Sequence, residues 1–203
     1  MADGFRLIYV VGASGAGKDS VIAAARAALA ARGDVVVARR VVTRPAGAGG
    51  EDHETCGPEA FARRRAEGGF ALAWEANGLL YGVPATIDAA LAAGRAVVVN
   101  GSRGALADSR RRYPAMMVVE LTAAPETLRR RLIARDRETV ERIEARLVRA
   151  AALAADGDDI VRIANDGDLQ DAVAALVAAI VSRLAPDAAS RAPAPVNAYR
   201  ATS

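Results

Sequence analysis

The chain has 203 residues, a formal net charge of +3, 52% hydrophobic residues and 4% aromatic residues. This length and apolar content suit one compact domain with a sizeable core. No run approaches the roughly 20 apolar residues that span a bilayer, and the short apolar start predicts a buried strand instead of a secretory leader, so we expect a cytoplasmic protein. Dispersed arginines and few aromatic rings argue against nucleic-acid binding. A single cysteine, Cys56, excludes an internal disulfide.

The first quarter of the chain alternates between two patterns. Residues 6–11 form a β-branched run that ends in Gly12, residues 20–31 are Ala-rich with helical spacing, and residues 35–42 form a second apolar run. These patterns predict a strand, a helix and a second strand. The Gly-rich and acidic segment 45–57 predicts an irregular loop.

The next segment predicts a small antiparallel insert. Pro58 fits the first turn of a helix that ends near residue 67. Residues 70–75 and 79–83 flank the dipeptide Asn77-Gly78, which favours a tight hairpin turn.

Strands and helices alternate through the rest of the chain. The predicted elements are a helix at 85–93, strands at 96–100 and 116–121, a helix from Pro125, a helix at 139–154, a strand at 160–163 and a helix at 169–184. This alternation predicts an α/β fold with a mainly parallel sheet, covered on both faces, and with ligands beyond the carboxyl ends of its strands. The composition of residues 185–203, rich in Ala, Pro and Ser, predicts a disordered tail.

A phosphate-binding loop follows the first predicted strand. The motif GxxxxGK followed by Asp-Ser is formed by Gly12, Ala13, Ser14, Gly15, Ala16, Gly17, Lys18, Asp19 and Ser20. Its glycines let backbone N–H groups converge on phosphate oxygens, and the following helix adds its partial positive charge. We therefore expect a P-loop NTPase fold with ATP in this loop and Lys18 at the β and γ phosphates.

One position departs from that motif. Asp19 stands where a serine or threonine normally gives its hydroxyl to magnesium, and Ser20 follows one residue later. A carboxylate is also a hard oxygen ligand, so we expect Asp19 to hold Mg²⁺ directly or through water. A decayed site is the alternative, against which the preserved lysine and glycines argue.

Several motifs in order resemble the guanylate kinases and, within that superfamily, the ribose 1,5-bisphosphate phosphokinases of phosphonate catabolism. They are GASGAGKDS, VVTRP followed by GGEDH, FALAWEANGLLYGVP, VVVNGSR, LRRRLIARDRETVERIEARL and IANDG. The resemblance covers about residues 6–180. It implies one guanylate kinase-like domain at 1–184, with an acceptor-binding insert at about 40–84 and a helical lid at about 131–146.

The resemblance also indicates how the acceptor site differs from that of guanylate kinase. There, a hairpin glutamate accepts hydrogen bonds from guanine, and Leu72 aligns with it. Leaving the polar edge of guanine unpaired costs about 1–3 kcal/mol per group, which implies that base recognition is lost. Arg44 and Tyr81 correspond to ligands of the acceptor phosphate, whereas Gly47 replaces a second arginine of the family pattern.

Further substrate ligands are expected from the insert and from the end of one strand. The resemblance places His53 near a phosphate-binding tyrosine of the family, although a loop histidine without a role is an alternative. Glu75 is either a surface carboxylate or a ligand of the sugar hydroxyls.

The end of the strand at 96–100 is expected to carry Asn100, Ser102 and Arg103 as substrate ligands, because ligands bind beyond such strand ends. The alternative is a helix N-cap at Ser102. Guanylate kinases usually have an aspartate at the position of Asn100, and we hypothesise that Asp19 supplies the missing carboxylate.

Four arginines lie on the two helices of the expected lid. Arg131 and Arg135 are four residues apart, as are Arg142 and Arg146, so each pair shares a helix face. The resemblance assigns catalytic phosphate contacts to Arg131, Arg135 and Arg146, and a solvated helix face is the alternative for each.

The function implied by the resemblance is transfer of the γ-phosphoryl group of ATP, with Mg²⁺, to ribose 1,5-bisphosphate, giving 5-phosphoribosyl 1-diphosphate (PRPP) and ADP. A guanylate or other nucleoside monophosphate kinase is the nearest alternative. A non-catalytic guanylate kinase-like interaction module is a second one. We expect a small phosphorylated sugar as the substrate and neither nucleic acid nor membrane as a partner, while the oligomeric state stays open, a homodimer included.

Overall fold

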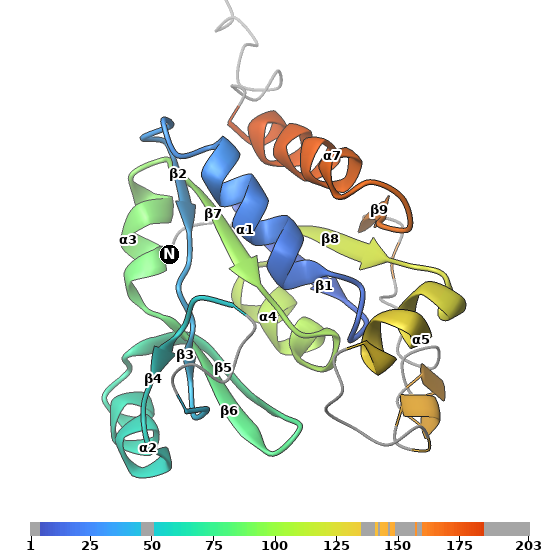
Figure 1. Cartoon of the computed structure of the whole chain (residues 1–203). Coiled ribbons are helices and arrows are strands. Elements are labelled where there is room, and N and C mark those ends of the chain that lie inside the picture. The colour runs from blue at the N-terminus through green and yellow to red at the C-terminus, as the bar shows by residue number, and fades with distance from the viewer. Residues whose placement is uncertain are drawn as a thin grey trace, which may run out of the picture.

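The computed structural model describes residues 5–45, 51–134, 141, 143–145, 147–148, 157 and 160–184. These residues form two sheets, a central sheet and a smaller one at one end of it (Figure 1). We call the smaller one the acceptor sheet, after the acceptor-binding insert expected at about 40–84. No helix in these ranges is both long and apolar enough to cross a membrane.

The central sheet has the strand order β2-β7-β1-β8-β9, and every neighbouring pair is parallel. Its strands are β1 (Leu7–Gly12), β2 (Val35–Val37), β7 (Ala96–Asn100), β8 (Met117–Thr122) and β9 (Ile160–Ala164). The mainly parallel sheet is therefore confirmed. β1 and β7 lie inside the sheet, which is why both are continuous apolar runs.

Helices cover both faces of the central sheet. They are α1 (Lys18–Ala28), α3 (Thr86–Ala92), α4 (Leu106–Arg112), α5 (Pro125–Ile133) and α7 (Leu169–Ser182), and a 3₁₀ turn at Arg103–Ala105 precedes α4. α1 and α7 lie side by side on one face (Figure 1). Ile8 and Val10 of β1 pack into the core on that face, whereas Leu7 and Tyr9 pack into the core beneath α3 and α4.

The acceptor sheet has the order β4-β3-β6-β5. Its elements are β3 (Val41–Val42), β4 (Glu54–Thr55), α2 (Pro58–Ala66), β5 (Phe70–Ala76) and β6 (Leu79–Pro84). The predicted hairpin is confirmed: β5 and β6 are antiparallel, and Asn77 and Gly78 have φ values of 52° and 71°. Positive φ at both central residues is the geometry of a type I′ turn.

Two predictions for the insert were wrong. The single strand at 35–42 is two strands, β2 in the central sheet and β3 in the acceptor sheet. The break includes Arg40, whose guanidinium turns into a buried ion pair that an apolar pattern does not reveal. Segment 45–57 is not wholly irregular, because Glu54 N donates to Arg40 O (2.8 Å) and so starts β4 beside β3.

Three expectations fall outside the described residues. They are most of the helix at 139–154, most of the lid, and the tail at 185–203.

Candidate active site

A glycine-rich turn joins β1 to α1. Gly15 and Gly17 have φ values of 90° and 87°, and α1 begins at Lys18. A Cβ atom on Gly17 would lie 2.4 Å from Nδ2 of Asn165, so this position has no room for a side chain. Gly17 is also the N-cap and offers no side-chain cap to the first N–H groups of the helix. Such a helix start binds anions well.

Lys18 lies over this turn. Its Nζ donates hydrogen bonds to the carbonyl oxygens of Gly12 (2.9 Å) and Ala13 (3.4 Å). Burial lowers the pKa of Lys18 to about 8; the cations Arg40 and Arg103 act in the same direction, and nearby carboxylates oppose them. A bound triphosphate would stabilise the ammonium form and raise this pKa again.

Two further side chains donate hydrogen bonds to the backbone of the turn. Asn165 follows β9 directly and is 2% exposed; its Nδ2 donates to Ala16 O (2.8 Å), and its Oδ1 is buried without a hydrogen-bond partner. Arg131 Nη1 donates to Gly15 O at 3.5 Å. Arg131 therefore reaches the P-loop, while Arg135 and Arg146 lie outside the described residues. Sequence analysis quoted Asn165 within IANDG but gave it no role.

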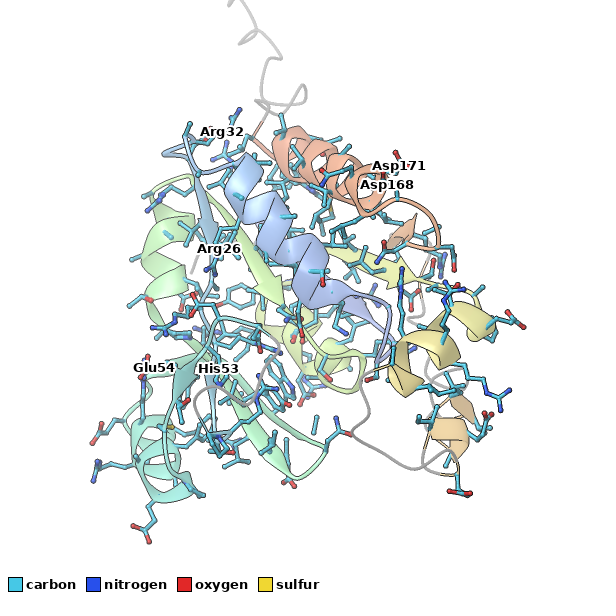
Figure 2. The ribbon with its side chains drawn as sticks, in the orientation of Figure 1. Arg26, Arg32, His53, Glu54, Asp168 and Asp171 are labelled. Atoms are coloured by element: carbon cyan, nitrogen blue, oxygen red, sulfur yellow. The ribbon has the colours of Figure 1, made fainter. Side chains whose placement is uncertain are left out.

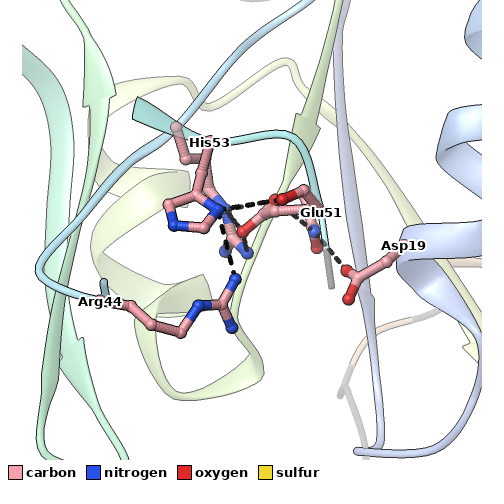
Figure 3. A network of polar contacts seen from close by, with 6 residues as sticks. Asp19, Arg44, Glu51 and His53 are labelled. Atoms are coloured by element: carbon pink, nitrogen blue, oxygen red, sulfur yellow. Dashed lines mark hydrogen bonds and ion pairs between the residues drawn. The ribbon is translucent and has the colours of Figure 1, made fainter. Parts of the chain in front are cut away.

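Asp19 and Glu51 converge on Asn100 at the end of β7 (Figure 3). The Asn100 Nδ2 donates to Asp19 Oδ1 and to Glu51 Oε2, each at 2.9 Å. Asn100 is 4% exposed, so it holds both carboxylates at the edge of the interior. These carboxylates are hard oxygen donors beside the P-loop and fit Mg²⁺. The described residues hold no metal-binding group of three or more His, Cys, Asp or Glu, so phosphates and water would complete the coordination.

Glu51 also forms a buried ion pair that sequence analysis missed. Both Nε and Nη2 of Arg40 donate to its carboxylate, and the two side chains are 9% and 13% exposed. The Arg40 guanidinium carbon lies 5.6 Å from the ring centroid of Trp74 and 4.9 Å from that of Tyr81. The only available signal was the pair of charged residues, Arg39 and Arg40, that interrupts the Val-rich run at 35–42.

Arg44 and His53 meet on the acceptor side (Figure 3). Arg44 Nη2 lies 3.3 Å from His53 Nδ1, which also lies 2.9 Å from the carbonyl oxygen of Glu51. Nδ1 can accept from the guanidinium or donate to the carbonyl, but it cannot do both at once. Arg44 Nε and His53 Nε2 are buried without hydrogen-bond partners. Unpaired buried polar atoms are rare and often mark a place for a ligand.

The segment that carries His53 is tied to α1 and to the segment after β2. Asp52 accepts hydrogen bonds from Arg26 of α1 (3.0 Å) and from Arg39 (2.9 Å), and Arg39 also donates to His53 O at 3.1 Å. Arg26 and His53 are labelled in Figure 2. The Arg26 hydrogen bond is the main cause that lowers the pKa of Asp52. Because these pairs are exposed, they position the segment more than they stabilise the fold.

The other predicted ligands are placed unequally. The backbone of Ser102 exchanges hydrogen bonds with the buried hydroxyl of Tyr9, and Ser102 is the N-cap of the 3₁₀ turn without a side-chain cap. Arg103 is near enough for its charge to lower the pKa of Lys18. Glu75 is exposed and follows Trp74 on β5, so it points to the face of the hairpin opposite Trp74 and Tyr81. The structure therefore does not bring Glu75 to the other residues.

Comparison with solved structures agrees with this architecture. A guanylate kinase from Anaplasma phagocytophilum matches with a TM-score of 0.63 and 19% identity, over 89% of this chain and 87% of that chain. The fold and the P-loop together define a P-loop NTPase with the guanylate kinase-like fold, as expected from the sequence.

The family follows from curated relatives, although no protein-family profile matches the chain. "Ribose 1,5-bisphosphate phosphokinase PhnN" of Azotobacter vinelandii is 53% identical over 180 residues, 89% of this chain and 98% of that protein. The protein of the same name from Pseudomonas paraeruginosa is 52% identical over 174 residues, 85% of this chain and 94% of that protein. The chain belongs to the ribose 1,5-bisphosphate phosphokinase family.

Proposed function

We propose that this protein transfers the γ-phosphoryl group of ATP to the 1-phosphate of ribose 1,5-bisphosphate, giving PRPP and ADP. The observation that carries the proposal is the bridge made by Asn100, which joins Asp19 of the P-loop helix to Glu51 of the acceptor side. The donor and acceptor halves of the site thus meet at one buried amide.

The reaction needs alignment and charge stabilisation. A phosphate oxygen of the acceptor attacks the γ-phosphorus, a new P–O bond forms, and the bond from that phosphorus to the β–γ bridging oxygen breaks, leaving ADP. The attacking oxygen is already anionic near neutral pH, so no strong general base is required. Lys18 and Arg131 are cations at the P-loop that would offset the repulsion between donor and acceptor.

Magnesium would be held by Asp19, with Glu51 as a second carboxylate beside it. The ion would neutralise charge on the β and γ phosphates. Asn100 would keep both carboxylates oriented toward that position, because its buried side chain donates to each of them.

The acceptor would be held by the insert. Arg44 Nε and His53 Nε2 are two of the buried atoms without partners, and a phosphate group could satisfy both. Tyr81 lies on the same side, stacked on Trp74 with ring centroids 5.7 Å apart. Leu72 is 7% exposed and packs in the core, so it offers no polar partner to a base.

Two acceptors assayed side by side test the proposal. Purified protein with ATP and Mg²⁺ is given ribose 1,5-bisphosphate or GMP, and ADP and PRPP are quantified. We expect a kcat/KM for the sugar bisphosphate at least about 100-fold above that for GMP. Preferred turnover of GMP would reject the assignment. ATP binding that is the same in wild type and Lys18→Ala, without turnover of either acceptor, would favour a non-catalytic module.

A further inference from the structure

The acceptor-facing side of the β5–β6 hairpin carries an aromatic surface made of two parallel rings. Trp74 and Tyr81 are paired across the hairpin, and their rings stack with an interplanar angle of 7°. Proteins bind nucleobases on surfaces of this kind, because every base has a π face that stacks on aromatic rings.

In this protein a guanidinium already covers that surface. Arg40 lies over both rings, with its guanidinium carbon 5.6 Å from the Trp74 centroid and 4.9 Å from the Tyr81 centroid. The guanidinium is planar and stacks on aromatic faces as a base does. A base that stacked on the ring faces under Arg40 would have to displace it.

Arg40 is held in this place from several directions. Glu51 accepts hydrogen bonds from its Nε and Nη2, and Asn100 in turn donates to Glu51 at 2.9 Å. Its own carbonyl oxygen accepts from Glu54 N at 2.8 Å, which fixes the backbone in the acceptor sheet. Arg40 is 8% exposed, so moving it would strand a buried carboxylate without its cation.

We propose that Arg40 is a specificity-determining residue that excludes nucleobases from the acceptor site by occupying the stacking face of Trp74 and Tyr81. The inference rests on the proposed function and explains how that site selects a sugar phosphate without a base. Leu72 only lacks a polar group that could bind a base, whereas Arg40 occupies the position in which a base would stack. Such a steric and electrostatic block is how a site discriminates against a competitor that shares the phosphate-binding groups.

The test replaces Arg40 and measures nucleotide binding and turnover. Trp74 is the only tryptophan of the chain, so its fluorescence reports a base that stacks on it. In Arg40→Ala we expect GMP and AMP to bind at least about tenfold more tightly than in wild type. We also expect the ratio of kcat/KM for ribose 1,5-bisphosphate to that for GMP to fall at least about 30-fold. The matched control is Arg32→Ala, an exposed arginine paired with Asp34 and not used in the site, which should leave GMP binding within about twofold.

Two further measurements keep the test decisive. If Arg40→Ala does not fold by circular dichroism, the double variant Arg40→Ala/Glu51→Gln uncovers the rings, removes both buried charges and is measured in the same way. The inference is overturned if neither variant binds GMP or AMP more tightly, or if both activities fall together with an unchanged ratio. Turnover of ribose 1,5-bisphosphate by wild type distinguishes a failure of the proposed function from a failure of the role of Arg40. Absence of this turnover rejects the proposed function. Its presence, with a kcat/KM ratio that is unchanged in the variants, rejects only the role of Arg40.

Discussion

The phosphate cradle is made of consecutive residues, 12–20, whereas the acceptor side draws its polar groups from separate segments around β3, β4, β6 and β7. The cradle relies on backbone groups and glycine conformations, with Lys18 as its main charge. The acceptor side relies on buried side-chain charges that neutralise one another, Arg40 with Glu51 above all. We therefore propose that the first half is a general binding site for a polyphosphate, and that the second is a specific arrangement of charges that a single substitution can unbalance.

The largest loss should follow removal of the one cation inside the cradle. We expect Lys18→Ala to reduce kcat/KM by about 10³-fold, because a preorganised charge at the transferring group is lost. Steady-state kinetics with ribose 1,5-bisphosphate measure this, and unchanged circular dichroism controls for folding. Lys18→Arg keeps the charge but not its compact shape, so it should recover only part of the loss. Activity of Lys18→Ala near the wild-type level would contradict the assignment of the cradle.

The next effect tests the junction between the two halves. Asp19→Ala should lower kcat by about 10²-fold and raise the Mg²⁺ concentration needed for half-maximal rate, because a hard oxygen ligand is lost. Binding of Mn²⁺, followed by electron paramagnetic resonance in the presence of an ATP analogue, gives a readout independent of turnover. Asp171→Ala is the matched control, since Asp171 is an exposed aspartate on α7 outside the candidate site. If Asp19→Ala leaves metal affinity and turnover unchanged, the metal assignment fails.

A substitution on the acceptor side should separate the two substrates. Arg44→Ala is expected to raise KM for the sugar bisphosphate by about 10- to 100-fold, the loss of one charge-assisted contact, with KM for ATP nearly unchanged. Glu75→Gln is the control, because Glu75 is exposed on the other face of the hairpin. Equal changes in both KM values, or a larger effect of Glu75→Gln, would break the comparison between the halves.

The difference between the halves also decides what the sequence could predict. The cradle, the individual strands and the hairpin each leave a pattern in neighbouring residues. The first strand, the glycines, Lys18 and the Asn77-Gly78 turn could therefore be predicted. The division of residues 35–42 between two sheets could not be predicted, because the break depends on the ion pair of Arg40 with Glu51, eleven residues away. Local patterns carry no information on such a partner.

The site residues show the same limit. Asn165 lies 149 residues from the carbonyl of Ala16 that it binds, and only the parallel sheet brings the ends of β1 and β9 to one edge. For Glu75 the sequence left two interpretations open, a surface carboxylate and a ligand of the sugar hydroxyls. Strand alternation at the hairpin decides which way its side chain points. Predicting the placement of Glu75 requires knowing that the face with Leu72 and Trp74 packs against the core, which the alternation alone does not give.

A smaller effect is expected for Asn165, whose side chain binds the backbone of the cradle. Asn165→Ala removes the hydrogen bond to Ala16 O and should weaken ATP binding by about tenfold, close to the cost of one buried hydrogen bond. Isothermal titration calorimetry with a non-hydrolysable ATP analogue measures it. The nearby Asp166→Ala is the control, because Asp166 accepts from Ala124 N instead of the P-loop. A loss of acceptor affinity without a loss of ATP affinity would contradict this role.

The smallest effect is a pH dependence that belongs to the cradle alone. Burial lowers the pKa of Lys18 to about 8 in the free protein, so the ammonium form is lost as the pH rises through that value. If the triphosphate binds only the ammonium form, affinity for an ATP analogue should fall about threefold between pH 7.5 and 8.5. Lys18→Arg stays charged in this range and should show a flat profile, which calorimetry at several pH values can measure. A flat profile in wild type, or the same slope in both proteins, would assign the dependence to another group.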